Sequence, residues 1–332
     1  MRARGLRRGG LLLTIGVGGL ALAAGALALQ EKGESRITAR IAVPGNPFAV
    51  ATGEGGVWVL DHPPTGCSSR RRCTVYRIDP ATYQVGRRIP MPYHAWDLVV
   101  GAGSVWVTQF DGRLIRIDAR TGRIVARISA RPLYFGSVVT FGGGFVWTGN
   151  DDERNTSGSV SKIDPATNEV VGTVDGMISP QSIAFGQGAV WVADHAGWLF
   201  KIDPERLEIV ARARLRFGPH GVVATNRAVY VADAHGNRLL EADPETAKIL
   251  RRVRLRVGAI HPAAGAASLW SGSSGVWTDG SVADDRVIRI AEGSLAIVET
   301  IHVGGQVPAV DFGFGSVWAA VWDGQIVRVR PG

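Results

Sequence analysis

Cysteine is scarce in this sequence, because Cys67 and Cys73 are the only two among its 332 residues. They do not form a C-x-x-C pair, and two cysteines by themselves make a poor zinc site, so they do not indicate a metal-bound scaffold. Only the five residues SSRRR separate them, a spacing that allows a small loop disulfide in an exported protein. We therefore expect a local structural disulfide between these two residues.

The sequence also lacks a strong excess of charge and the common catalytic motifs. Its formal net charge is +8, but four arginines and no acid lie in the first 30 residues, which leaves +4 for the remainder. This mild balance gives no reason to expect binding to nucleic acid. No H-E-x-x-H motif and no serine-nucleophile motif is present, and the glycines fall in turns between strands rather than in phosphate loops.

A long helical or apolar run is missing everywhere except at the N-terminus. There, four arginines within eight residues precede an uncharged stretch from Leu11 to Leu29. Such a segment is typical of a cleaved signal peptide or of a retained membrane anchor, and its length leaves both alternatives open. We expect residues 1–30 to be this segment, residues 31–35 a short linker, and residues 36–332 an extracytoplasmic domain that is secreted or anchored to the membrane.

What the sequence does contain is one phrase repeated along most of its length. A glycine-flanked turn, followed by an apolar triplet centred on an aromatic residue, occurs seven times. The spacings of 48, 41, 44, 39, 40 and 48 residues indicate one supersecondary unit repeated in series. The central aromatic residues are Trp58, Trp106, Trp147, Trp191, Tyr230, Trp270 and Trp318.

Each repeat has the pattern of four short strands. In one copy, turns rich in Gly, Asp and Pro separate apolar strands over 182–185, 189–193, 199–202 and 208–215. No helical period is present, so the pattern favours an all-β fold. Four strands in each of seven units predict a seven-bladed β-propeller with four-stranded antiparallel blades.

The two ends of the repeat array complement each other. The last unit stops at Gly332 after three strands, whereas the segment RITARIAV over 36–43 precedes the first unit and resembles the fourth strands of other units. We therefore predict that this N-terminal strand completes the last blade. Such closure would join the ends of the ring and pair edges that would otherwise be free.

The seven histidines are placed unevenly along the repeats. Three fall between strands two and three, and four fall at or just before a first strand, which puts them all on one face of an up-and-down propeller. Histidine is the usual residue for proton transfer and metal binding near neutral pH, so we expect this face to contact a ligand. The residues expected to make that contact are His94, His195, His235, Asp194, Trp96 and Gln181.

One stretch combines histidine with an acid. In PHGVVATNRAVYVAD, over 219–233, His220 precedes a first strand and Asp233 follows the second, while His261 comes one blade later. An acid and two imidazoles on adjacent blades have the composition needed for general acid/base catalysis. His220, His261 and Asp233 are therefore the candidate catalytic residues, beside the alternative of a binding face without catalysis.

The repeated phrases VSKIDPATNEVVGTV, VWVAD and VYVAD resemble the YVTN-type β-propeller repeats of bacterial exported and surface proteins. PHGVVATNRAVYVAD is also similar to repeats of the streptogramin B (virginiamycin B) lyase family, seven-bladed propellers that open a cyclic depsipeptide ester by elimination. The resemblance spans 36–332. It implies Mg²⁺ as cofactor and matches His220 and His261 to the family's two histidines. The family's glutamate should follow Trp270, where this chain has SGSS, so Asp279 from an inserted loop would have to substitute.

Three functions fit these observations. The first is an exported protein that binds an unknown small molecule or protein through its histidine-bearing face, and for it the sequence names no cofactor. The second is a lyase-like enzyme that uses Mg²⁺, and the third is a structural protein of the cell envelope. In each case we expect a monomer that meets the membrane only through its N-terminal segment.

Overall fold

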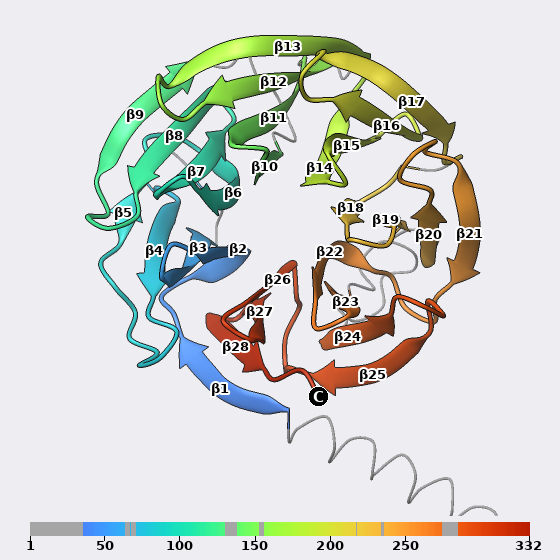
Figure 1. Cartoon of the computed structure of the whole chain (residues 1–332). Helices are drawn as coiled ribbons and strands as arrows, with labels where there is room; N and C mark the ends of the chain where they lie inside the picture. The colour runs from blue at the N-terminus through green and yellow to red at the C-terminus, as the bar shows by residue number, and fades with distance from the viewer. Residues whose placement is uncertain are drawn as a thin grey trace, which may run out of the picture.

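A computed structural model describes residues 36–63, 67, 71–129, 138–152, 156–216, 218–233, 236–273 and 285–332. Within these ranges every regular element is a β-strand, and no helix there is long and apolar enough to cross a bilayer. The strands form seven four-stranded antiparallel sheets arranged as blades around a central axis (Figure 1). The predicted seven-bladed β-propeller is confirmed, whereas residues 1–35 lie outside the described ranges.

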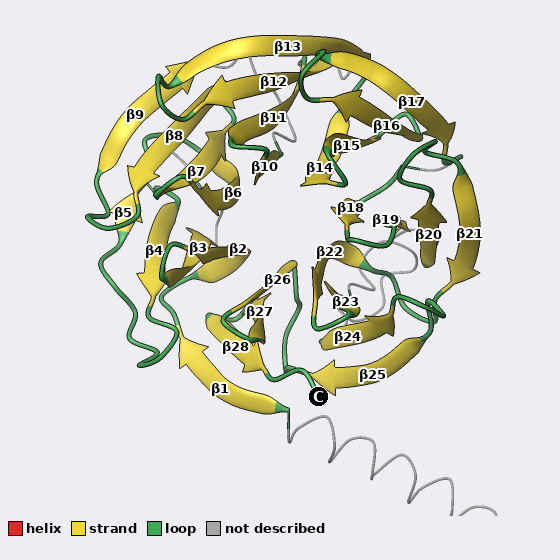
Figure 2. Ribbon diagram, in the orientation of Figure 1, coloured by secondary structure: helices red, strands yellow, loops and turns green. Residues whose placement is uncertain are grey.

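The blades follow one another in chain order, each running from an inner strand to an outer strand (Figure 2). Blades one to three comprise β2 (Asn46–Gly53), β3 (Gly56–His62), β4 (Thr74–Ile78), β5 (Ile89–Pro90), β6 (Ala95–Gly101), β7 (Ser104–Gln109), β8 (Arg113–Asp118), β9 (Ile124–Ser129), β10 (Val139–Gly142), β11 (Phe145–Asp151), β12 (Gly158–Asp164) and β13 (Glu169–Met177). Blades four to six comprise β14 (Pro180–Gly186), β15 (Ala189–Asp194), β16 (Trp198–Asp203), β17 (Glu208–Arg214), β18 (Gly221–Ala224), β19 (Val229–Asp233), β20 (Arg238–Ala242), β21 (Ile249–Arg254), β22 (Ile260–Gly265), β23 (Ser268–Gly272), β24 (Arg286–Ala291) and β25 (Ile297–His302). Blade seven comprises β26 (Ala309–Gly313), β27 (Ser316–Val321), β28 (Gln325–Val329) and β1 (Ile37–Ala42).

The ring closes through the N-terminal strand, as the sequence predicts. Strand β1 pairs antiparallel with β28, with Ile41 opposite Ile326, and becomes the outer strand of blade seven. Ile41 and Val43 are buried in a cluster that also includes residues of blade one. Closure therefore pairs the edge of β28 and covers the apolar seam between the last blade and the first.

The repeated tryptophan lies at the centre of six blades, where its side chain is at most 1% exposed. In five of these blades the indole Nε1 donates a hydrogen bond of 3.0–3.1 Å to the carbonyl oxygen of a glycine five residues earlier. Lys or Arg lies opposite on the third strand, with its charged group 4.8–5.7 Å from the ring centre. The buried ring thus has both a polar partner and a cation–π contact. These pairs are Arg116 with Trp106, Lys162 with Trp147, Lys201 with Trp191, Arg289 with Trp270, and Arg328 with Trp318.

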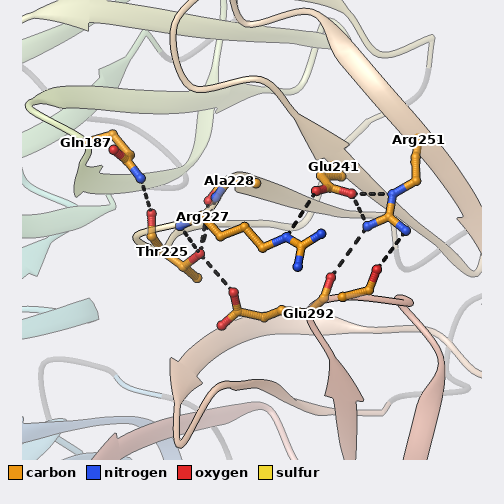
Figure 3. Close-up of polar contacts among 8 residues, drawn as sticks. Gln187, Thr225, Arg227, Ala228, Glu241, Arg251 and Glu292 are labelled. Atoms are coloured by element: carbon orange, nitrogen blue, oxygen red, sulfur yellow. Dashed lines mark hydrogen bonds and ion pairs between the residues drawn. The ribbon is translucent and has the colours of Figure 1, made fainter.

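Blade five replaces this pair with one of the opposite charge. Tyr230 takes the place of tryptophan, and Glu241 lies opposite it on the third strand. The Glu241 carboxylate is 5% exposed and pairs with Arg251, while Arg227 lies 3.7 Å away (Figure 3). Arg251 also donates to backbone carbonyls of Glu292 and Gly293 in blade six. A buried carboxylate requires such partners, and here they also link two blades.

Candidate functional site

The inner strands of the blades surround an axial cavity of about 620 Å³. Its wall comes from strands such as β2, β6, β18 and β22 and from the segments just before them, so the cavity lies toward the histidine-bearing face. Most of the wall is apolar, and a cavity of this size and character is typical of a small-molecule site. Its principal polar groups are His220, His261, Asp97, Asp311 and Gln306.

His220 and His261, both candidates from the sequence, line this one cavity. His220 lies just before β18, where its backbone N–H donates to the Ala232 carbonyl at 2.9 Å. His261 lies at a β-bulge in β22 with φ of 44°, a left-handed conformation that is rare outside glycine. A Cβ at Gly221 would collide with Pro262, so glycine there allows the two histidine segments to pack closely.

His261 is exposed to the cavity solvent, and the protein atoms around the cavity desolvate it in part. This desolvation lowers the pKa of His261 to about 4. The imidazole is therefore neutral at physiological pH, with one nitrogen able to donate and one able to accept a hydrogen bond.

Two carboxylates that the sequence analysis missed face the same cavity. Asp97 accepts hydrogen bonds from the N–H of Leu98 at 2.8 Å and of Val139, on the next blade, at 3.1 Å. Asp311 accepts from the N–H and the hydroxyl of Thr52 at 2.6 and 2.7 Å, which joins blade seven to blade one. Burial raises the pKa of Asp97 to about 6 and also raises that of Asp311. The sequence signal was an acid within an otherwise apolar first strand.

An aromatic wall separates the cavity from the loops of blades one and two. Phe48 stacks on His62 with ring centres 4.3 Å apart and contacts Trp96 at 5.0 Å. Trp96 contacts Phe110 at 5.2 Å, and Phe110 contacts His94 at 4.3 Å. Phe48 and Trp96 face the cavity, whereas the two histidines lie behind them. Desolvation lowers the pKa of His62 to about 4 and also lowers that of His94.

The two acidic candidates, Asp194 and Asp233, each lie at the end of a second strand and have structural partners. Asp194 is fully buried and accepts from the N–H groups of Ile178, Ser179 and Ala196 at 2.8–2.9 Å. Asp233 is 1% exposed and accepts from the N–H of Gly236 at 2.8 Å. Both carboxylates therefore fix turns, and neither lines the axial cavity.

The remaining expected contact residues lie away from the cavity wall. His195 is exposed, and its backbone N–H donates to the Ser179 carbonyl at 2.8 Å. Gln181 is half-buried and donates to the Ser179 hydroxyl at 3.0 Å. His235 lies outside the described residues. The structure thus brings His220, His261 and Trp96 to one cavity, and the other described candidates are not among the residues that line it.

The two cysteines are joined in a disulfide whose Cα atoms are 5.3 Å apart. Cys73 is completely buried and packs in the core cluster shared by blades one and two. The bond therefore ties the long segment between β3 and β4 to the start of β4.

The residues present around His220 and His261 do not fit Mg²⁺, which prefers several carboxylate or water oxygens. After Trp270, the Ser271 hydroxyl is fully buried and already bonds to the backbone of Ile260 and Gly272. The carboxylates of Asp97 and Asp311 are committed to neighbouring strands. Asp279 lies outside the described residues.

Comparison with known proteins leaves the fold as the main basis for classification. The chain matches no protein-family model and no curated protein sequence. The resemblance to YVTN-type and streptogramin B lyase repeats therefore stays a prediction from the repeated phrases, and what the structure itself establishes is a seven-bladed β-propeller with an axial cavity.

Proposed function

We propose that this chain is an exported binding protein that takes a small, mainly apolar molecule with hydrogen-bonding groups into its axial cavity. The observation that carries the proposal is the cavity itself, of about 620 Å³ with apolar walls and a few convergent polar side chains. Trp96 and Phe48 offer aromatic surface, and His220 and His261 offer polar contacts. Export through residues 1–30 and a monomeric state complete the proposal.

Binding is favoured over acid/base catalysis by the place of Asp233, which lies outside the cavity that His220 and His261 line. A general base works best when its pKa lies near the working pH, and the pKa of His261 is lowered to about 4. Such an imidazole is a weak base but a good neutral hydrogen-bonding partner. Asp233, the acid proposed beside the histidines, is committed to its own turn.

A fragment library screened by thermal shift should yield ligands that stabilise the chain, and calorimetry should then give their affinity. We expect His261→Ala and Trp96→Ala to weaken the best ligand by about 10-fold or more, since each removes a wall contact worth about 1.4 kcal/mol or more. Because the Asp97 carboxyl faces the same cavity and its pKa is raised to about 6, affinity should hold from pH 8 to about pH 7 and change below that as Asp97 takes up a proton.

His195→Ala is the matched control, because this exposed histidine lies on the same face but outside the cavity wall. The His195→Ala variant should bind the best ligand with the same affinity as the unchanged chain. If the His261→Ala and Trp96→Ala variants both bind the ligands with unchanged affinity, the axial cavity is not the binding site.

The second candidate is the lyase-like activity, favoured by the two imidazoles that share one cavity. This activity predicts loss of intact streptogramin B, measured by chromatography with and without added Mg²⁺, and the loss should fall sharply in His220→Ala. An antibiotic that survives incubation with the purified chain and Mg²⁺ would exclude this substrate.

A further inference from the structure

A cluster of two histidines and two cysteines lies behind the aromatic wall. His62 ends β3, Cys67 and Cys73 belong to the segment between β3 and β4, and His94 lies just before β6 of the next blade. One ligand atom from each of the four side chains lies within 4.8 Å of the others. Cys73 is buried, and the other three are half-buried.

Two thiolates and two imidazoles form one of the common ligand sets of tetrahedral zinc. With Zn–S of about 2.3 Å and Zn–N of about 2.0–2.1 Å, the four ligand atoms of such a site lie about 3.3–3.8 Å apart. Adjustments of about 1 Å within the cluster would bring the imidazoles to this geometry, and the two sulfurs would have to separate. They can separate only once the disulfide between them is reduced.

The surroundings of the cluster already orient two of its members. The backbone N–H of Ala95 lies 3.3 Å from Sγ of Cys73, and the carbonyl of the same residue is 3.0 Å from Nε2 of His62. Because a carbonyl only accepts, His62 donates through this nitrogen and keeps a lone pair on its other one. In zinc sites a backbone N–H typically donates to a ligating sulfur and a ligating histidine donates to a backbone carbonyl, and both hydrogen bonds fix ligand orientation.

We propose that reduction of the Cys67–Cys73 disulfide converts this cluster into a zinc site with His62, Cys67, Cys73 and His94 as its ligands. A dithiol reductant would supply two electrons and two protons, breaking the S–S bond to give two thiols while the dithiol closes to its own disulfide. Zn²⁺ would then displace both thiol protons and leave a centre without net charge.

The site would connect two blades rather than one loop. The disulfide joins residues of blade one alone, whereas His94 belongs to the segment that leads into blade two. The bound metal would also lie directly behind His62, which stacks on Phe48 of the cavity wall. This inference does not depend on the proposed ligand-binding function.

Cobalt tests the proposal, since tetrahedral Co²⁺ bound to thiolates gives intense visible bands and a sulfur-to-metal charge-transfer band. The full chain is reduced with a dithiol, freed of reductant without air and titrated with Co²⁺, and Zn²⁺ is then added in competition. We expect one equivalent of tetrahedral Co²⁺, displaced by Zn²⁺, in the reduced chain and none in the oxidised chain.

The His94→Ala variant removes the ligand from blade two and should weaken Zn²⁺ binding by about 10-fold or more. His195→Ala, an exposed histidine outside the cluster, should bind like the unchanged chain. Far-ultraviolet circular dichroism of each metal-free sample shows whether the reduced fold persists. If it does not, the expected result is that Zn²⁺ restores the spectrum.

Three outcomes would overturn the proposal. One is a reduced chain that is folded but gives no tetrahedral Co²⁺ bands. Another is a reduced chain that unfolds and is not restored by Zn²⁺. The third is equal metal binding by the reduced, oxidised and His94→Ala forms, which would indicate a site elsewhere.

Discussion

A chain that begins at residue 44, and so lacks β1, should no longer form a folded monomer. Without this strand the edge of β28 has no partner, and the apolar seam beneath Ile41 and Val43 is open to water. The ion pair of 2.9 Å between Arg36 and Glu299 of blade six is lost as well. We expect the free energy of unfolding to fall by more than about 5 kcal/mol, which equals the whole stability of a marginally stable domain.

Size-exclusion chromatography with light scattering and thermal melting by circular dichroism measure this effect. The control is a chain that begins at residue 36, because all seven sheets are built from residues 37–329. It should be monomeric and melt cooperatively. A chain from residue 44 that stays monomeric and melts within about 3 °C of the control would show that the ring does not need its N-terminal strand.

Trp191→Ala should lower the free energy of unfolding by about 3–5 kcal/mol, the range for removing a large aromatic side chain from a core. The Trp191 ring is completely buried and packs in the core cluster between blades four and five. The substitution also leaves the Gly186 carbonyl without its indole donor and removes the ring under Lys201. Guanidinium unfolding followed by circular dichroism measures the change.

Trp322→Ala is the matched control for this experiment, since it removes the same side chain from a position that is 38% exposed. It should cost clearly less than Trp191→Ala, because Trp322 lies at the wall of the solvent-filled axial cavity and not in a core cluster. Equal losses in the two variants would mean that the repeated tryptophan does not organise its blade.

The architecture could be predicted from the sequence because the features that determine it are local and repeated. The strands around Trp191 were predicted to within two residues of β14 to β17, and the segment 36–43 contains β1. Alternation and turn residues act over a few neighbouring positions, and the period appears when the sequence is compared with itself, so one sequence suffices to detect all three. The histidine-bearing face was inferred from the up-and-down order of the strands, which puts alternate loops on the same face.

The internal arrangement of the site was harder to predict from the sequence. Asp97 was not singled out, because its role depends on a backbone N–H that the next blade supplies at Val139. The meeting of His94 with Cys73 likewise depends on how blade two packs on blade one. Asp194 was expected to face a ligand, yet its carboxylate is used by local N–H groups, a competition common for aspartate in turns.

Tyr230 and Glu241, which replace the tryptophan–cation pair in blade five, bear on how the ring assembles. Seven units of similar sequence offer a folding chain many near-equivalent partners, and repeat proteins characteristically fail by misassembly and domain swapping. Among the described residues, Glu241 pairs with Arg227 and Arg251 of its own blade, and Arg251 in turn donates to the backbone of blade six. Because blade five differs from the other blades at its centre, its strands are poor substitutes for theirs. We therefore expect this difference to disfavour pairing between strands of the wrong blades.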